Sequence, residues 1–417
     1  MQVKNRFPVK IQSIIGLIFI FGIILMGCET KNPSPVFNEN ASYADDPVVQ
    51  SINPPDSAIA GVDLVTINGQ NFADSVDANT VYFNSVEASV VSATPTQLVV
   101  SLPHVPEIAG DSVEVLVDVD GSLQFAKYKY NVRMAVKPLV TDLGPQDELH
   151  GIALDVQNNI FAVTGIDLIK EYDSAGLFLN VYSWMSTIVN ENMIYAPEGR
   201  LYTGGKLGRT FFIFAITFSP DTSYSTNLVN VSSNPIDYDF DPNGTLWAAL
   251  PTKVIKVTGT ATDNPTSTDL ASYSGMSLLS LRYYDGQLYL LASDGGQLGV
   301  WVSDTTSGNV TQLADLSGLS SENFKAYDME LDNQGGIFVS TNLDTPLQYI
   351  TPVERTVKPY YAGLFPTSPM KALIWKNGGH YLLATATDPD EGTPVIYQID
   401  TKTLTGATRW GRELSME

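Results

Sequence analysis

The chain has 417 residues, of which 44% are hydrophobic and 16% charged, a balance that can bury a core and excludes a wholly disordered protein. Its formal net charge of -22 argues against nucleic-acid binding, because an acidic surface repels phosphate. One cysteine and three histidines are too few for zinc clusters or a disulfide framework. The length predicts two domains or one large repeat fold.

Residues 1–27 have the pattern of a signal peptide, with a basic start followed by the apolar run 14–26. The sequence Leu-Met-Gly that ends in Cys28 resembles the bacterial lipobox, which implies cleavage before Cys28 and lipidation of its thiol. A plain membrane anchor with a chance cysteine is the alternative. Glu29 follows Cys28, and by resemblance to lipoprotein sorting rules this favours the outer membrane. Residues 28–46 lack an apolar period and are predicted to form a flexible tether.

Residues 47–134 contain short alternating strands separated by turns, a pattern typical of an immunoglobulin-like sandwich. The segment resembles the IPT/TIG family in several pieces, which are Ile52–Pro55, Gly61–Gly69, Phe72, Val81–Ala88, Thr94–Pro103 and Tyr128–Tyr130. Asn84 stands where the family often has glycine, and asparagine also tolerates a left-handed turn. The resemblance implies a spacer or binding module without catalytic residues. Phe72 and Val81 are expected in its core.

Residues 137–410 repeat a turn followed by an apolar strand every 41–49 residues. The turns begin at Asn158, Gly199, Gly244, Gly286, Gly335 and Gly378. This period predicts an all-β, six-bladed propeller, although a seventh, unrecognised unit stays an alternative. The turns Asp155–Asn159 and Asp241–Gly244 resemble those of NHL-type propellers. Residues 136–142 are expected to supply the strand that closes the ring, and each domain is expected to fold alone.

Ligands of a propeller usually lie at its axis, where the innermost strands begin. The polar residues predicted at those entries are Glu148, His150, Glu191, Asn192, Asp237, Lys325, Asp328 and Lys371. They are equally explained as the polar lining of a solvated channel. By resemblance to propeller lactonases, three of them could hold a divalent metal, namely Glu191, Asn192 and Asp237. Lys325 and Lys371 would place opposing charge at the same opening, so no bound metal is expected.

Other chemical motifs are weak. The run that starts at Asp239 fits the beginning of a calcium loop, but its twelfth position is Leu250 rather than glutamate, so no cofactor is predicted. His150 could act as a general base, but no serine-protease order of residues accompanies it. Trp247 and Trp375 are expected in the core, whereas Trp301 and Trp410 are left as weak candidates for stacking on sugar rings.

These patterns predict an outer-membrane or cell-surface lipoprotein, attached through Cys28, that binds a ligand without catalysis. The expected partners are the membrane, through the lipid anchor, and a glycan or an outer-membrane protein; nucleic acid is not expected. Two alternatives remain open. One is an enzyme at the propeller axis, such as a metal-dependent lactonase or a lyase, and the other is a scaffold protein.

Overall fold

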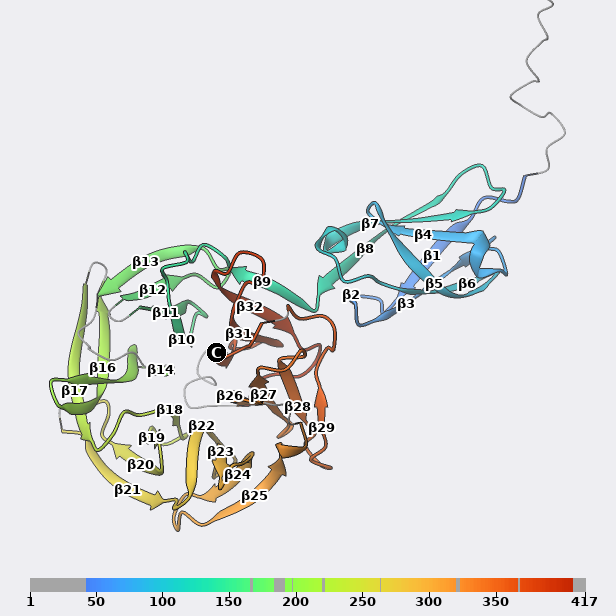
Figure 1. Cartoon of the computed structure of the whole chain (residues 1–417). Coiled ribbons are helices and arrows are strands. Elements are labelled where there is room, and N and C mark those ends of the chain that lie inside the picture. The colour runs from blue at the N-terminus through green and yellow to red at the C-terminus, as the bar shows by residue number, and fades with distance from the viewer. Residues whose placement is uncertain are drawn as a thin grey trace, which may run out of the picture.

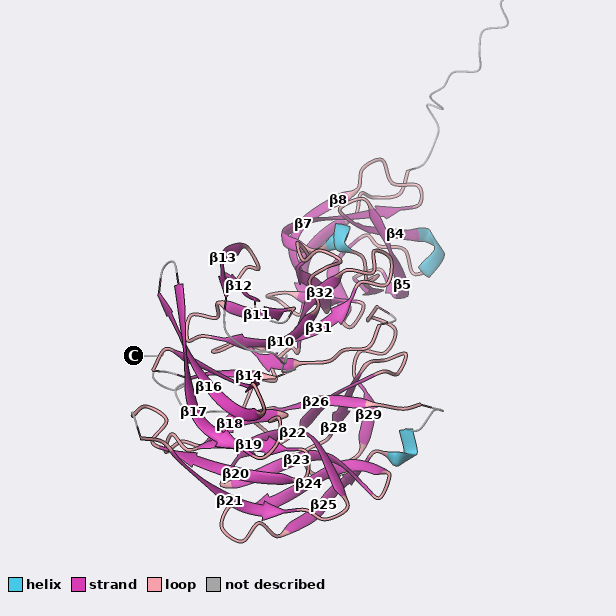
Figure 2. Cartoon of the chain, turned by 60° about the vertical axis from the view of Figure 1, so that its left-hand side comes forward, coloured by secondary structure: helices cyan, strands magenta, loops and turns pink. Residues whose placement is uncertain are grey.

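The computed structural model describes residues 43–165, 168–183, 192–196, 198–219, 222–262, 264–319, 323–366 and 368–407. The predicted signal peptide, most of the tether, Cys28 and Glu191 lie outside the described residues. The described part is built from strands, with three short 3₁₀ turns at Val76–Ala78, Pro106–Ile108 and Ser317–Leu319 (Figure 2). No helix in it is long and apolar enough to cross a membrane.

The N-terminal domain is a β-sandwich whose strands follow the order β1-β3-β6-β5-β4-β7-β8-β2. The strands are β1 (Val48–Asn53), β2 (Ala58–Ala60), β3 (Leu64–Gln70), β4 (Asn79–Phe83), β5 (Val86–Thr94), β6 (Gln97–Ser101), β7 (Gly110–Val119) and β8 (Ala126–Met134). Alternate residues point into a shared apolar core, as in β7, where every second residue from Val113 to Val119 is buried. Phe72 and Val81 lie in this core, as predicted. Asn84 has φ 53°, which is the left-handed turn conformation expected from the sequence.

Six four-stranded sheets follow and are arranged as a ring (Figure 1), so the predicted six-bladed propeller is confirmed. Blade 1 has β10 (Leu149–Leu154), β11 (Ile160–Thr164), β12 (Leu168–Tyr172) and β13 (Phe178–Ser183); blade 2 has β14 (Met193–Ala196), β15 (Arg200–Leu207), β16 (Thr210–Ser219) and β17 (Thr222–Val231); blade 3 has β18 (Asp237–Phe240), β19 (Leu246–Leu250), β20 (Lys253–Thr258) and β21 (Thr266–Ser272). Blade 4 has β22 (Met276–Tyr284), β23 (Gln287–Asp294), β24 (Gln297–Asp304) and β25 (Val310–Asp315); blade 5 has β26 (Ala326–Leu331), β27 (Ile337–Thr341), β28 (Leu347–Ile350) and β29 (Val357–Pro359); blade 6 has β30 (Leu373–Trp375), β31 (Tyr381–Thr387), β32 (Pro394–Asp400) and β9 (Val136–Val140).

The ring is closed by β9, which comes first in the propeller sequence but pairs antiparallel with β32 in the last blade. This is the closing strand predicted near residues 136–142. The second strand of each blade packs between neighbouring blades, so β11, β19 and β27 are buried along their whole length. Burial on both faces explains why these strands are continuous apolar runs rather than alternating ones.

The recurring turn is the hairpin between the first two strands of each blade. Gly199, Gly244, Gly335 and Gly378 have φ between 70° and 85° there, and Asn158 has φ 66°. This conformation strains residues other than glycine and asparagine. Because each of these hairpins needs a residue with positive φ at the same place, glycine or asparagine recurs there and produces the repeat seen in the sequence.

The sandwich and the propeller share a packed seam. Ile59 of β2 is 1% exposed and belongs to the apolar cluster of blades 5 and 6, with Tyr361 and Leu364 packed against it. Two ion pairs cross the seam: Arg133 Nη1 lies 2.8 Å from Asp400 Oδ2, and Lys402 Nζ lies 2.6 Å from Asp63 Oδ1. The linker at residue 135 is itself buried, so the domains are more closely coupled than the sequence suggested.

Candidate functional site

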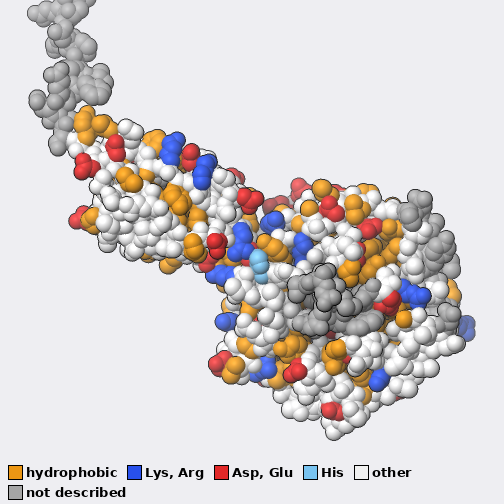
Figure 3. All heavy atoms as spheres, turned by 180° about the vertical axis from the view of Figure 1, so that it is seen from behind, with side chains coloured by type: hydrophobic (Ala, Val, Ile, Leu, Met, Phe, Trp, Pro, Cys, Tyr) orange, Lys and Arg blue, Asp and Glu red, His pale blue; other side chains and the backbone are white. Residues whose placement is uncertain are grey.

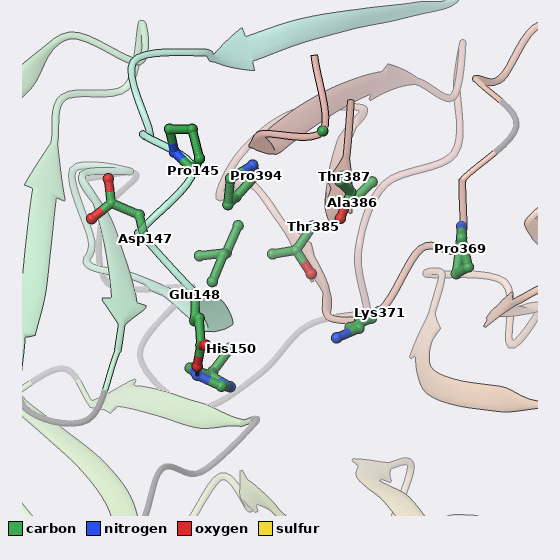
Figure 4. A pocket seen from close by; sticks show the side chains of 12 residues that line it. Pro145, Asp147, Glu148, His150, Pro369, Lys371, Thr385, Ala386, Thr387 and Pro394 are labelled. Atoms are coloured by element: carbon green, nitrogen blue, oxygen red, sulfur yellow. Dashed lines mark ion pairs between the residues drawn. The ribbon is translucent and has the colours of Figure 1, made fainter. Parts of the chain in front are cut away.

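A pocket of about 330 Å³ opens between blades 1 and 6, and we call it the mouth pocket (Figure 4). Its lining residues are Pro145, Asp147, Glu148, Leu149, His150, Pro369, Lys371, Thr385, Ala386, Thr387, Gly392 and Pro394. Glu148 and His150 lie together on one wall, and Lys371 and Thr385 lie on the facing side. Three of the eight predicted axis residues therefore meet here: Glu148, His150 and Lys371.

Local irregularity in β10 positions the first wall. The pairing of β10 with β11 shifts between Leu149 and Ile152, and such a bulge re-aims the side chains within it. His150 lies in this shift, and its Nε2 atom is 3.8 Å from Glu148 Oε2. Asp147 braces the same segment, because its Oδ2 atom accepts hydrogen bonds from Lys170 Nζ and from the Gly144 amide, both at 2.7 Å. These two hydrogen bonds fix the chain at Asp147, whereas the side chain of the next residue, Glu148, is 78% exposed.

The opposite wall is fixed through its backbone. The Lys371 amide donates to the Thr385 carbonyl, and Ser340 Oγ donates to the Lys371 carbonyl at 2.6 Å. The Lys371 side chain is exposed, and its ammonium group forms no hydrogen bond or ion pair with any residue that the structure describes. A positioned cation thus faces the pocket without a partner among the described residues.

A second, smaller cavity of about 20 Å³ lies deeper on the axis. Asn192, Asp237 and Asp328 line it, and they account for three more of the predicted residues. Lys325 lines neither cavity; it is exposed beside Asn342, which accepts a hydrogen bond from its amide. The expectation that Lys325 shares an opening with Lys371 stays a prediction, since Lys325 lines neither of these two cavities.

Arg282 lies at the centre of the ionic cluster in the deeper cavity, and it was not among the residues predicted from the sequence. Its guanidinium bonds to Asp237, to Asp328 at 2.9 Å and to Glu330 at 3.0 Å, and only 6% of its side chain is exposed. Strand register explains the gathering. Asp239, Arg282 and Glu330 pair with Trp247, Tyr289 and Phe338. Each of these partners lies three residues after the hairpin glycine of its blade, so the three charged residues occupy equivalent positions in blades 3, 4 and 5. Comparison of these repeat positions is the signal that could have revealed the cluster.

Burial and charge oppose each other in this cluster. Burial works against the charge of Arg282, but Asp237, Asp328, Glu330 and Asp239 outweigh it and hold the arginine pKa well above its usual value. Burial raises the pKa of Asp328 to about 7, although Arg282 opposes this shift. Ser280 Oγ lies 2.7 Å from both Asp237 Oδ2 and Asp328 Oδ1. A hydroxyl has one proton to donate, so Ser280 donates to only one of these two carboxyl groups at a time.

Asp237, the described carboxylate of the predicted metal set, has other partners. Asp237 Oδ2 accepts from Arg282, Ser280 Oγ and the Leu281 amide, and its Oδ1 atom accepts from the Tyr238 amide. Among the described residues, no group of three or more His, Cys, Asp or Glu side chains is arranged to hold a metal. Because Glu191 is not described, the predicted set of three cannot be assembled in this structure.

The calcium-like run is a hairpin turn. Asp241 Oδ1 accepts from the amides of Asn243 and Thr245, both at 2.9 Å, and its Oδ2 atom accepts from the indole of Trp247. Asp155 and Asp332 accept backbone amides in the same way in blades 1 and 5. The recurring aspartate therefore shapes the turn.

The tryptophan prediction was partly wrong. Trp247 and Trp375 are buried as expected, but Trp301 is also only 6% exposed, within the cluster of blades 3 and 4. It is therefore no platform for a sugar ring. Trp410 lies outside the described residues.

The molecule is thus a six-bladed propeller preceded by an immunoglobulin-like domain, with a polar pocket near the axis. Residues 47–132 match the IPT/TIG domain family. No curated protein matches the chain.

Solved structures share the architecture at low sequence identity. An auxiliary nutrient binding protein from Bacteroides thetaiotaomicron is 11% identical with a TM-score of 0.52, covering 85% of this chain and 97% of its own. A similarly described protein from Bacteroides ovatus is 12% identical, with a TM-score of 0.48 and coverages of 85% and 97%. A gluconolactonase from Xanthomonas campestris is 11% identical, with a TM-score of 0.46 and coverages of 70% and 90%. Binding proteins and enzymes both occur among them, so these similarities establish the fold alone.

Proposed function

We propose that the protein is a cell-surface lipoprotein that captures a small sugar or short glycan in the mouth pocket, without catalysis. The observation that carries this proposal is the pocket itself, a concave site of about 330 Å³ with convergent polar groups. Lipidation at Cys28 would tether the protein to the outer membrane, and the sandwich would hold the propeller away from the lipid.

The lining suits a polyhydroxylated ligand. Lys371, His150, Glu148 and the threonine hydroxyls offer both donors and acceptors, while three prolines add apolar surface. Concave sites in which a few placed polar groups fix the orientation of a ligand are typical of small-molecule binding. The nutrient binding protein of Bacteroides thetaiotaomicron shares the architecture, which supports a role in nutrient capture by analogy.

The specific chemistry of the deeper cavity also favours binding over metal catalysis. Asp237 is neutralised by Arg282 rather than left open toward the axis. An enzyme at the mouth would need to work with His150 and Glu148, whose ring nitrogen and carboxylate oxygen are 3.8 Å apart. The test below separates these functions.

The proposal is tested by screening a glycan panel and measuring affinity by calorimetry for the wild type and Lys371→Ala. Removing the cation that faces the pocket should weaken binding about tenfold, on the order of 1.4 kcal/mol. Lys325→Ala is the matched control, because it removes the same charge from an exposed lysine that lines neither cavity. Equal losses in both variants, or product formation that His150→Ala abolishes, would contradict the proposal.

A further inference from the structure

A separate pocket of about 320 Å³ lies at the seam between the sandwich and the propeller, and we call it the seam pocket. The sandwich contributes Ala109, Gly110, Asp111, Val132, Arg133 and Met134, and the propeller contributes Lys137, Tyr381, Gln398 and Asp400. Figure 3 shows Lys and Arg side chains, with a histidine, gathered where the two domains meet. Pockets between domains are common places for ligands.

The charges of the seam pocket are only partly matched. Arg133 Nη1 contacts Asp400, whose side chain is 1% exposed, and His380 Nε2 at 2.6 Å. The Arg133 Nε atom is buried without a hydrogen-bond partner among the described residues. Lys137 is exposed, and no ion pair involving it is found in the described part of the chain. Asp111 adds one exposed acid at the sandwich side.

A third cation adjoins the pocket from blade 6. Lys376 Nζ donates to the Ser174 carbonyl at 2.7 Å and to Gln398 Oε1 at 3.1 Å, and Gln398 lines the pocket. Burial lowers the pKa of Lys376, and the charge of Lys137 lowers it further. Asp173 acts on Lys376 in the opposite direction, so three cations lie near three acids in and beside the pocket, namely Asp111, Asp173 and Asp400. Lys137 and Lys376 repel each other. Their mutual repulsion would be relieved by a bound anion.

We propose that the seam pocket binds a small oxyanion, a carboxylate, sulfate or phosphate group, between Lys137 of the propeller and Arg133 of the sandwich. Arginine offers several N–H donors in a plane, and lysine adds a compact charge, a combination that suits oxyanions. Because the two cations come from different domains, the anion links them across the seam. This site is distinct from the mouth pocket and does not depend on the proposed function.

Two matched pairs of probes test the seam pocket on the full chain at constant ionic strength. Sodium glucuronate is compared with glucose, which lacks the carboxylate, and sodium sulfate is compared with sodium chloride. Binding is followed by calorimetry and by the NMR titration of the lysine side chains. We expect saturable binding of glucuronate, of sulfate or of both at the seam pocket, and no binding of glucose there. We also expect the pKa of Lys376 to rise when the anion is bound.

Variants locate the site. Lys137→Gln should weaken anion binding about tenfold or more and should itself raise the pKa of Lys376, since the neighbouring charge is gone. Lys358→Gln, which removes an exposed lysine of blade 5, and Lys371→Ala, which alters the mouth pocket, should both bind the anion as the wild type does. Saturation by glucuronate alone identifies an organic acid as the ligand class, and saturation by sulfate identifies a general oxyanion site. The proposal is overturned if neither anion saturates, or if Lys137→Gln binds like the wild type.

Discussion

At the scale of single residues, the described part of the axis holds more acidic groups than Arg282 alone can neutralise. From β18, Asp237 and Asp239 face the cluster, from β22 come Arg282 and Ser280, and from β26 come Asp328 and Glu330. The neighbouring strands β10, β14 and β30 present apolar side chains to the same cavity. A buried carboxyl in such a cluster is more stable when it is protonated.

The stability of the protein should therefore depend on Asp328 near neutral pH. Its folded pKa of about 7 lies above its ordinary value of 3.8, so the folded state binds more protons between these values. The unfolding free energy then falls as pH rises through this window and levels off above it. Between pH 6 and pH 8 the loss should be about 1 kcal/mol.

Asp328→Asn should remove that loss, because the amide does not titrate. Urea unfolding at pH 6 and pH 8 measures the difference in unfolding free energy between the wild type and the variant. Burial lowers the pKa of His104, which gives an opposite pH trend, but His104 is present in both proteins and its effect cancels in this difference. The wild type should be stabilised over the variant more at pH 6 than at pH 8. A pH-independent difference would show that Asp328 does not titrate between pH 6 and pH 8, which contradicts the prediction.

At the scale of elements, the hairpins between the first two strands of each blade explain why the propeller could be predicted from the sequence. A left-handed residue is needed at the same place in several blades, so glycine or asparagine recurs and the blade count follows. Residues at the start of the inner strands or shortly before them, such as His150 and Lys371, could be placed near the mouth for the same reason. The closing strand could be found because one blade lacked an outer strand.

The same reasoning could not find contacts that depend on neighbouring blades. Arg282 stands in an apolar strand, and only its register against Asp237 and Glu330 shows that it completes an ionic cluster. Trp301 was judged freer than it is because its burial comes from packing across blades 3 and 4. Local pattern carries little information about such long-range packing.

At the scale of the whole molecule, the seam joins two domains whose sequences predict separate folding. Ile59 projects from the sandwich into the apolar cluster of the propeller, and Arg133 pairs with Asp400 beside it. Because apolar burial and ion pairs cross the boundary, unfolding of one domain exposes a surface of the other. The sandwich is therefore packed against the propeller rather than joined to it by a free linker alone.

Ile59→Asp should uncouple the domains by placing a charge in that cluster. We expect a loss of about 2–4 kcal/mol at the seam and two separate transitions in calorimetry, where the wild type shows one. Leu64→Asp is the control, because Leu64 is 56% exposed in the same sandwich and should tolerate the charge. If both variants melt like the wild type, the seam does not couple the domains.

The central claim, that ligand is captured at the mouth pocket, is tested most directly by hydrogen exchange with the strongest glycan from the panel at saturation. Bound ligand should slow amide exchange in residues 146–150, 370–371 and 385–393, the segments that line the mouth pocket. Exchange in blades 3 and 4, remote from these segments, should be unchanged. Protection confined to other blades, or none at saturating ligand, would contradict the account.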